Sequence, residues 1–138
     1  MAKSHAKHWF WAWTVLATSQ KEKLRDPNAR CEVWENLIIL HARTPREALA
    51  KAEKIGHAEA GDCSGSLRLD GKPALCKFVG VASLGLIHDD LVDGAEITWR
   101  LKRCKRSAAV KSLTPRATLI AEAEKEFRHV HRAATRAI

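Results

Sequence analysis

The longest nearly uncharged apolar run in the chain is Ala-Leu-Cys-Lys-Phe-Val-Gly-Val-Ala-Ser-Leu-Gly-Leu-Ile, residues 74–87, and we expect the sheet to be organised around it. Lys77 is its one charged residue, and apolar side chains occupy both alternating faces. A strand that is apolar on both faces is typical of a covered, central position in a sheet. We therefore expect residues 74–87 to form the middle of the sheet, with Gly80 and Gly85 marking a bulge or the close approach of another backbone.

Two further strands are predicted before this run. Residues 9–16 alternate in a way that places Trp9, Trp11 and Trp13 on one side, and residues 31–42 are also rich in β-branched and large apolar side chains. The charged segment 18–30 contains Asp-Pro-Asn and is typical of a hairpin loop, so the two strands should be antiparallel neighbours. A row of indoles forms either core or an interface, and we expect this row to be core.

The clearest local signal is Thr-Pro-Arg-Glu at residues 44–47, which predicts the start of a helix. Thr44 can cap the amide of Glu47, proline suits the first helical position, and Glu47 can reach back to the amide of Thr44. Gly56 or Gly61 can end this helix. Its apolar stripe is narrow and rich in small residues, which predicts close packing on the sheet: Ala48, Leu49, Ala52 and Ile55.

The remaining elements complete an α+β fold. Residues 67–74 predict a hairpin about Asp70-Gly71, and residues 95–101 predict a last strand after an acidic turn. Thr114-Pro115 marks the start of a second helix. We therefore predict an antiparallel sheet of four or five strands, with one helix packed on a face and an appended C-terminal helix.

Charge divides the chain into a neutral body and a basic end. The net charge is +8, and residues 1–99 hold 13 basic and 13 acidic side chains, whereas residues 100–138 hold 11 basic and 3 acidic ones, a difference of 8. A chain of 138 residues fits one domain with its own core. We predict a disordered N-terminus at residues 1–8, an α+β domain at residues 9–103, and a basic extension with an amphipathic helix at residues 104–138.

Cysteine spacing and hydropathy indicate the compartment. The four cysteines form no Cys-x-x-Cys pair, and no cleavable signal sequence precedes the predicted strands, so a disulfide scaffold is not expected. Every apolar run is well short of the roughly 20 residues needed to span a bilayer. We predict a cytoplasmic protein with no membrane span.

Metal and acid–base chemistry have candidate residues but no supporting motif. A zinc site would need His57, Cys63, Cys76 and His88, whose spacing lacks the short knuckles of structural zinc sites. An acidic turn could hold magnesium or an acid–base pair, but its side chains also suit simple capping of backbone amides: His88, Asp89, Asp90, Asp93 and Glu96. Without a nucleophile motif, Walker loop or dinucleotide fingerprint, we expect no catalytic residue, no cofactor and no enzyme.

The C-terminal extension carries the two functions that we weigh. Its helix has one apolar stripe with three- and four-residue spacing, made of Ile120, Ala123, Phe127, Val130 and Ala134. We favour a non-catalytic protein-interaction module that docks onto a protein partner or a second copy through this helix or through a sheet edge. The alternative is non-sequence-specific nucleic-acid binding through Arg100, Lys102, Arg103, Lys105, Arg106, Lys111 and Arg116, although no nucleic-acid recognition motif accompanies them.

The order of five pieces resembles a small bacterial family, the domain of unknown function 4288, over about residues 9–103. These pieces are the strand at 9–16, residues 35–41, Thr-Pro-Arg-Glu-Ala-Leu-Ala-Lys-Ala at 44–52, Lys-Phe-Val-Gly-Val at 77–81, and Leu-Val-Asp-Gly-Ala-Glu-Ile at 91–97. The resemblance implies a fold, a bacterial or phage origin, and a turn role for Asp93-Gly94. It implies no activity, and residues 105–138 lie beyond it.

Overall fold

The computed structural model describes the backbone of residues 6–136 and the side chains of residues 6–130 and 132. The chain divides into two compact units, Met1–Trp99 and Arg100–Ile138, and each is described by itself. Of the N-terminal segment that we expected to be disordered, residues 1–5 lie outside the described residues. His8 already begins the first strand.

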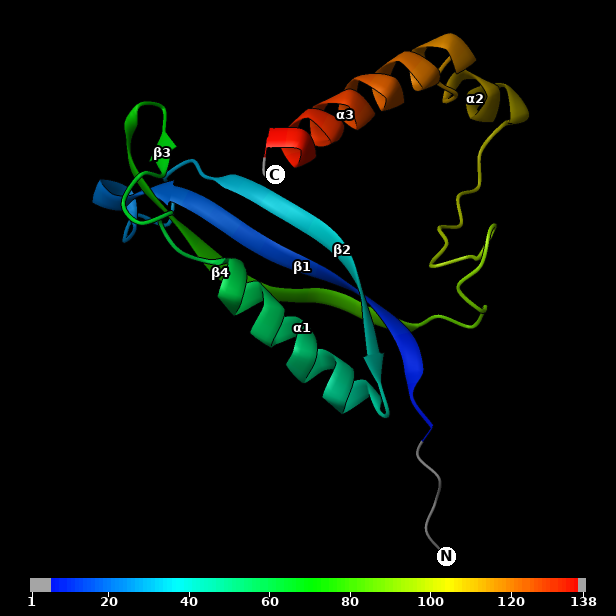
Figure 1. Ribbon diagram of the computed structural model, residues 1–138, viewed down its shortest axis with the longest axis horizontal. Helices are drawn as coiled ribbons and strands as arrows, with labels where there is room; N and C mark the ends of the chain where they lie inside the picture. Colours follow the sequence, from blue (N-terminus) through cyan, green and yellow to red (C-terminus); the bar gives the residue numbers. More distant parts are fainter. Residues whose placement is uncertain (1–5, 137–138) are drawn as a thin grey trace, which may run out of the picture. The chain divides into compact units, whose positions relative to one another are not determined.

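The first unit holds a four-stranded antiparallel sheet in the order β2-β1-β4-β3 (Figure 1). The long strand β1 (His8–Gln20) pairs with β2 (Glu32–Ala42) on one side and with β4 (Lys72–Leu86) on the other. The short strand β3 (Arg68–Leu69) pairs with the start of β4 through a turn at Asp70 and Gly71, which both have positive φ angles, as a two-residue hairpin requires. A short 3-10 turn, η1 (Lys21–Lys23), follows β1. The predicted α+β fold class is confirmed.

The prediction that residues 74–87 form the middle of the sheet holds for the strand order, in which β4 is an inner strand, but β1 is the strand that is paired on both sides along most of its length. β3 pairs with Lys72 and Pro73 alone, and Gly61 forms an isolated bridge to Cys76, so β1 is the single strand neighbour of the remainder of β4. The register between β1 and β4 shifts twice and leaves Val79 and Ala82 without a direct partner. The expected bulge near Gly80 is thus confirmed, and this glycine has a φ of +156° that few other residues adopt. Bulges of this kind suit an edge rather than the interior of a sheet.

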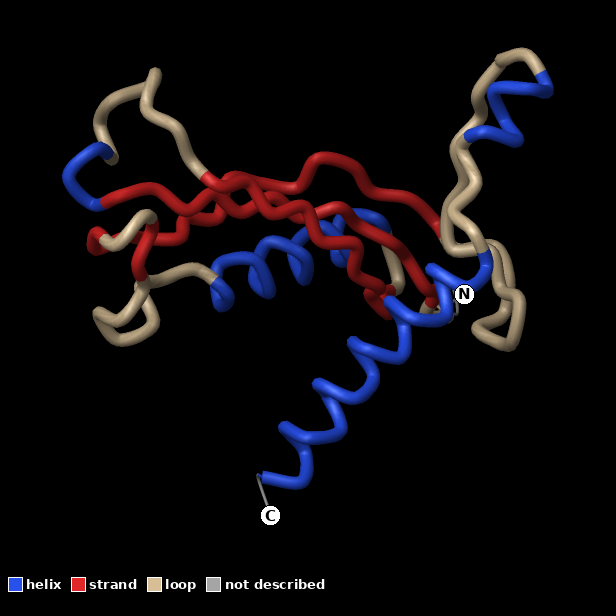
Figure 2. The backbone as a smooth tube through the Cα atoms, turned by 90° about the horizontal axis from the view of Figure 1, so that it is seen from above, coloured by secondary structure: helices blue, strands red, loops and turns tan. Residues whose placement is uncertain are grey.

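Helix α1 (Pro45–Glu59) covers one face of the sheet (Figure 2). As predicted, Thr44 caps the helix, and its Oγ1 accepts a hydrogen bond from the amide of Glu47 at 3.1 Å. The Glu47 carboxylate accepts from the amide of Arg43 rather than from that of Thr44. The helix ends after Glu59, so Gly56 lies inside it and Gly61 lies just beyond it.

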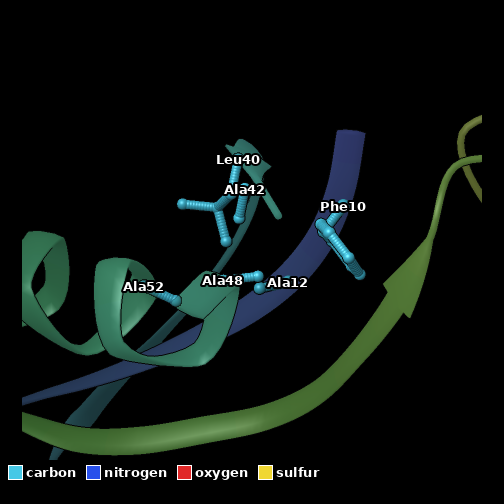
Figure 3. Close-up of a cluster of buried hydrophobic side chains, with 6 residues drawn as sticks. All are labelled: Phe10, Ala12, Leu40, Ala42, Ala48 and Ala52. Carbon is cyan, nitrogen blue, oxygen red and sulfur yellow. The ribbon is translucent and has the colours of Figure 1, made fainter. Parts of the chain in front are cut away.

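Small residues lie where α1 meets the sheet. The helix buries Ala48, Ala52 and Gly56, whereas Leu49 and Ile55, which we placed in the same stripe, are each 37% exposed. The main buried cluster comprises Phe10, Ala12, Leu40, Ala42, Ala48 and Ala52 (Figure 3). Alanine and glycine let a helix lie close to a sheet because little side chain separates the two backbones. The predicted close packing is confirmed.

The indoles of β1 lie on the other face of the sheet. Phe10, Ala12, Thr14 and Leu16 are buried, whereas Trp9, Trp11 and Trp13 alternate with them and are half-buried. The expectation that the indole row forms the core is therefore wrong. The alternation was correctly recognised, but the buried face of β1 is the one that carries Phe10, Ala12, Thr14 and Leu16.

The predicted last strand at residues 95–101 is absent from the structure, where these residues are irregular. The Asp89 carboxylate accepts a hydrogen bond from the amide of Glu96, and two local backbone bonds turn residues 90–95. These bonds hold residues 89–96 as a loop, called the acidic loop below, and not as a strand that pairs with β4.

The second unit contains two helices, α2 (Arg106–Lys111) and α3 (Arg116–Arg136). The helix predicted after Thr114-Pro115 is α3, whereas the short α2 was not predicted. Within the described residues, neither helix is long and apolar enough to cross a membrane, and the same holds for α1.

Candidate functional site

The apolar stripe of α3 is exposed within its own unit. Ile120 is 44% exposed, Val130 is 62% exposed, and Phe127 and Ala123 on the same side are also exposed. Every residue of 100–130 whose side chain is described is exposed. The side chain of Ala134, which we placed in the same stripe, lies outside the described ones. The second unit therefore buries none of these apolar residues in a core of its own.

The basic residues predicted to contact nucleic acid lie in the same unit, before and at the start of α3. All seven are exposed: Arg100, Lys102, Arg103, Lys105, Arg106, Lys111 and Arg116. Three of them, Arg106, Lys111 and Arg116, lie on helices, and the others lie in the irregular segment before α2. The ion pairs found among the described residues all lie in the first unit. None of them involves one of the seven basic residues at 100–116.

The acidic loop forms part of an open hollow of about 480 Å³ in the first unit. Trp11 and Trp99 line it together with His88, Asp89 and Glu96. The Trp11 indole lies against Gly85, where a side-chain carbon would come within 2.3 Å of the ring. Gly85 therefore permits the close approach of an indole, rather than marking the bulge or the approach of another backbone that we expected.

This hollow holds three of the five residues considered for acid–base or magnesium chemistry. Asp90 and Asp93 are not among its lining residues. The three that line it are exposed, and one Asp89 oxygen already accepts the Glu96 amide. Asp side chains in turns commonly accept hydrogen bonds from backbone amides in this way. The geometry therefore favours a structural loop.

The four residues considered for zinc do not come together. The His57 ring contacts the edge of Phe78 with centroids 4.7 Å apart, and Cys63 and Cys76 line a different hollow from the one that His88 lines. Among the described residues, no group of three or more histidine, cysteine or acidic side chains could hold a metal ion.

The outer edge of β2 is a surface that the sequence analysis left unspecified. β2 is the terminal strand of the sheet, and its pairing with β1 runs without a shift from Ala42 to Glu32. Val33, Leu37 and Ile39 project on the indole side and are 56%, 40% and 44% exposed. A signal for this regular edge was present, since residues 32–42 contain no glycine or proline, whereas residues 72–86 contain both.

The fold and its surfaces define a small α+β domain with one helix on its sheet, followed by a basic helical extension. A family model described as a domain of unknown function, DUF4288, matches residues 9–99. The chain belongs to the DUF4288 family, as the order of its motifs indicated. No curated protein and no solved structure matches the chain.

Proposed function

We propose that the chain is a non-catalytic protein-interaction module of the bacterial cytoplasm. It docks onto a protein partner or a second copy through its C-terminal helix or a sheet edge. The observation that carries this proposal is the exposure of the α3 stripe, and of Ile120 and Val130 in particular. Amphipathic helices use apolar residues at three- and four-residue spacing to fill a groove on a partner.

The composition of α3 supports binding rather than burial in a core. Glu122, Lys125 and His129 occupy the side of the helix opposite the stripe, so one face suits water and the other suits an apolar surface. An isolated helix gains little stability from propensity alone, and burying the stripe on a partner would supply what its own unit does not.

Affinity capture with the full chain tests the proposal, because matched variants separate the stripe from the charge. Ile120→Lys with Val130→Lys introduces two cations into the stripe, and Thr118→Lys with Ala121→Lys introduces two cations on the opposite side of the same helix. We expect the first pair to lose a specific protein partner that wild type and the second pair retain at high salt after nuclease treatment. Equal capture by both pairs would contradict docking through α3.

Nucleic-acid binding is the second candidate, and the seven exposed cations at residues 100–116 support it. Neutralising phosphates releases counterions, so binding should be independent of sequence and should weaken steeply as salt rises. We expect Lys105→Gln with Lys111→Gln to reduce the slope of log K against log salt by roughly 2, about 1 for each lost phosphate contact. The control is Lys51→Gln, which removes a cation paired with Glu47. An unchanged slope, or no shift of labelled DNA or RNA at low salt, would refute this candidate.

A further inference from the structure

We propose that the outer edge of β2 pairs antiparallel with β2 of a second copy, so that two sheets join into one across a two-fold axis. This inference rests on the proposed interaction function. It specifies which sheet edge docks and what occupies it, and it does not depend on α3.

The two edges of the sheet differ in their capacity to accept another strand. The outer edge of β4 is occupied near its start, where Ala74 donates to the Leu67 carbonyl and Cys76 exchanges two hydrogen bonds with Gly61. Beyond that point β4 carries the two register shifts. β2, in contrast, offers eleven residues in unbroken register with β1. Bulges and covering segments are how proteins prevent edge pairing, and β2 has neither along its described length.

The backbone groups that β2 directs outward follow from three hydrogen bonds. Ile87 donates to the Trp9 carbonyl, so Trp9 directs its groups toward β4, and its partner His41 must direct its own groups away from β1. Lys51 of α1 donates to the His41 carbonyl, which agrees with an outward direction of that group. Thr14 on β1 donates to the Asn36 carbonyl, so this even-numbered residue directs its carbonyl toward β1. The direction of the backbone groups alternates along a strand, so the N–H and C=O groups of the odd-numbered residues point away from β1, at Val33, Glu35, Leu37 and Ile39. Another extended strand is the natural complement of such a row.

A second copy of β2 fits this edge. Residues 33–40 contain one charged side chain, Glu35, and a two-fold axis near Leu37 or Ile38 sets it opposite Ile39 or His41 of the other copy. The two carboxylates are thereby kept apart, and the first unit as a whole has equal numbers of acidic and basic residues. Side chains opposite each other in an antiparallel pair share a face, so the exposed Leu37 of one copy would lie beside Leu37 or Ile39 of the other, depending on the position of the axis.

Two substitutions at one residue separate backbone pairing from side-chain docking. Leu37→Pro removes an outward amide, and we expect it to raise the dimer dissociation constant more than about 100-fold, because the change occurs twice in a two-fold dimer. Leu37→Ala shortens the side chain but keeps the amide, and we expect it to remain dimeric with a loss below about tenfold. Sedimentation equilibrium of the full chain measures both. A monomeric wild type, a dimeric Leu37→Pro or a monomeric Leu37→Ala would each overturn the proposal.

Amide hydrogen exchange of the wild-type chain decides the matter even if Leu37→Pro does not fold. In a β2 dimer the amides of Leu37 and Ile39 are protected at high protein concentration and lose that protection on dilution, whereas the amide of Ile38, bonded within the sheet, stays protected. Fast exchange of Leu37 and Ile39 at every concentration would overturn the proposal.

The α3 stripe variant separates this inference from docking through α3. Ile120→Lys with Val130→Lys should leave the dimer constant within a factor of about two, because both changes lie in the second unit and leave the sequence of β2 as it is. Loss of the dimer in this variant would overturn pairing through β2 and leave docking through α3 supported.

Discussion

The two faces of β1 differ in the size of their side chains and in what covers them. On the face toward α1, Phe10, Ala12 and Leu16 are at most 4% exposed, and the helix buries alanine and glycine there. Figure 3 shows Phe10 and Ala12 with Ala48 and Ala52 of the helix. On the other face three indoles are only half-buried. The helix contributes only small side chains to this contact, and the three indoles lie on the face that α1 does not cover. The buried core of the first unit thus lies between α1 and one face of the sheet, whereas the indoles on the other face are only half-buried.

The sharpest test of this difference compares two leucines on one strand. Leu40 is buried toward α1, and Leu37 is 40% exposed on the indole side. We expect Leu40→Ala to lower the unfolding free energy by about 2–5 kcal/mol, through lost burial and a cavity. Leu37→Ala should cost no more than about 1 kcal/mol. Urea melts at low protein concentration, where association does not contribute, measure both. Equal losses would show that the indole side is also core.

The contact between α1 and the sheet leaves no room for a side chain at Gly56. A side-chain carbon on Gly56 would come within 2.2 Å of the Phe78 ring. We expect Gly56→Ala to destabilise the fold by about 1–3 kcal/mol, because overpacking outweighs the gain in helix propensity. Combining it with Phe78→Leu should recover part of the loss in a chemical melt. A Gly56→Ala variant more stable than its parent would contradict the close packing.

The start of α1 offers a smaller effect on the covered face. Thr44→Ala removes the Oγ1 that caps the Glu47 amide and should cost about 1 kcal/mol. Thr118→Ala, an exposed threonine near the start of α3, serves as the control and should leave the first unit unchanged. Coincident urea melts for Thr44→Ala and wild type would show that the cap contributes nothing.

The weakest effect depends on pH. The amide of Arg43 holds the pKa of Glu47 below its usual 4.5, with a further contribution from Lys51. A carboxyl whose folded pKa is depressed stabilises the fold above its unfolded pKa, and that stabilisation is lost as pH falls through the folded value. The stability difference between wild type and Glu47→Gln should therefore be present at neutral pH and shrink below about pH 4.5. A difference that stays constant from pH 7 to pH 3 would contradict this role.

Much of the fold could be predicted from short stretches of sequence, because caps, turns and hairpins depend on residues close together in the chain. The Thr44 cap, the Asp70-Gly71 hairpin, the antiparallel pairing of β1 with β2 and the small residues of α1 were all predictable from neighbours in the chain. The position of β4 could not be predicted in the same way. An apolar run indicates that a strand is covered, but it does not show how many strands pair with it. The indole face was misassigned for a related reason, since bulk alone does not show which face a helix can approach.

The candidate surfaces were predictable to a lesser degree. The α3 stripe and the basic residues were named from their spacing and charge, and both are exposed in the structure. The free edge of β2 depends on strand order, which arises from pairing between residues distant in the sequence. The meeting of Trp11 with the acidic loop likewise joins residues more than 70 positions apart.

The most direct test of the proposed role of α3 is the unfolding free energy of Ile120→Lys with Val130→Lys relative to wild type. If the stripe serves binding, the urea midpoint and slope of the isolated chain should match those of wild type within about 0.5 kcal/mol, although partner capture is lost. A loss of several kcal/mol, comparable with that of Leu40→Ala, would show that the stripe belongs to the core and would contradict its role as a docking surface.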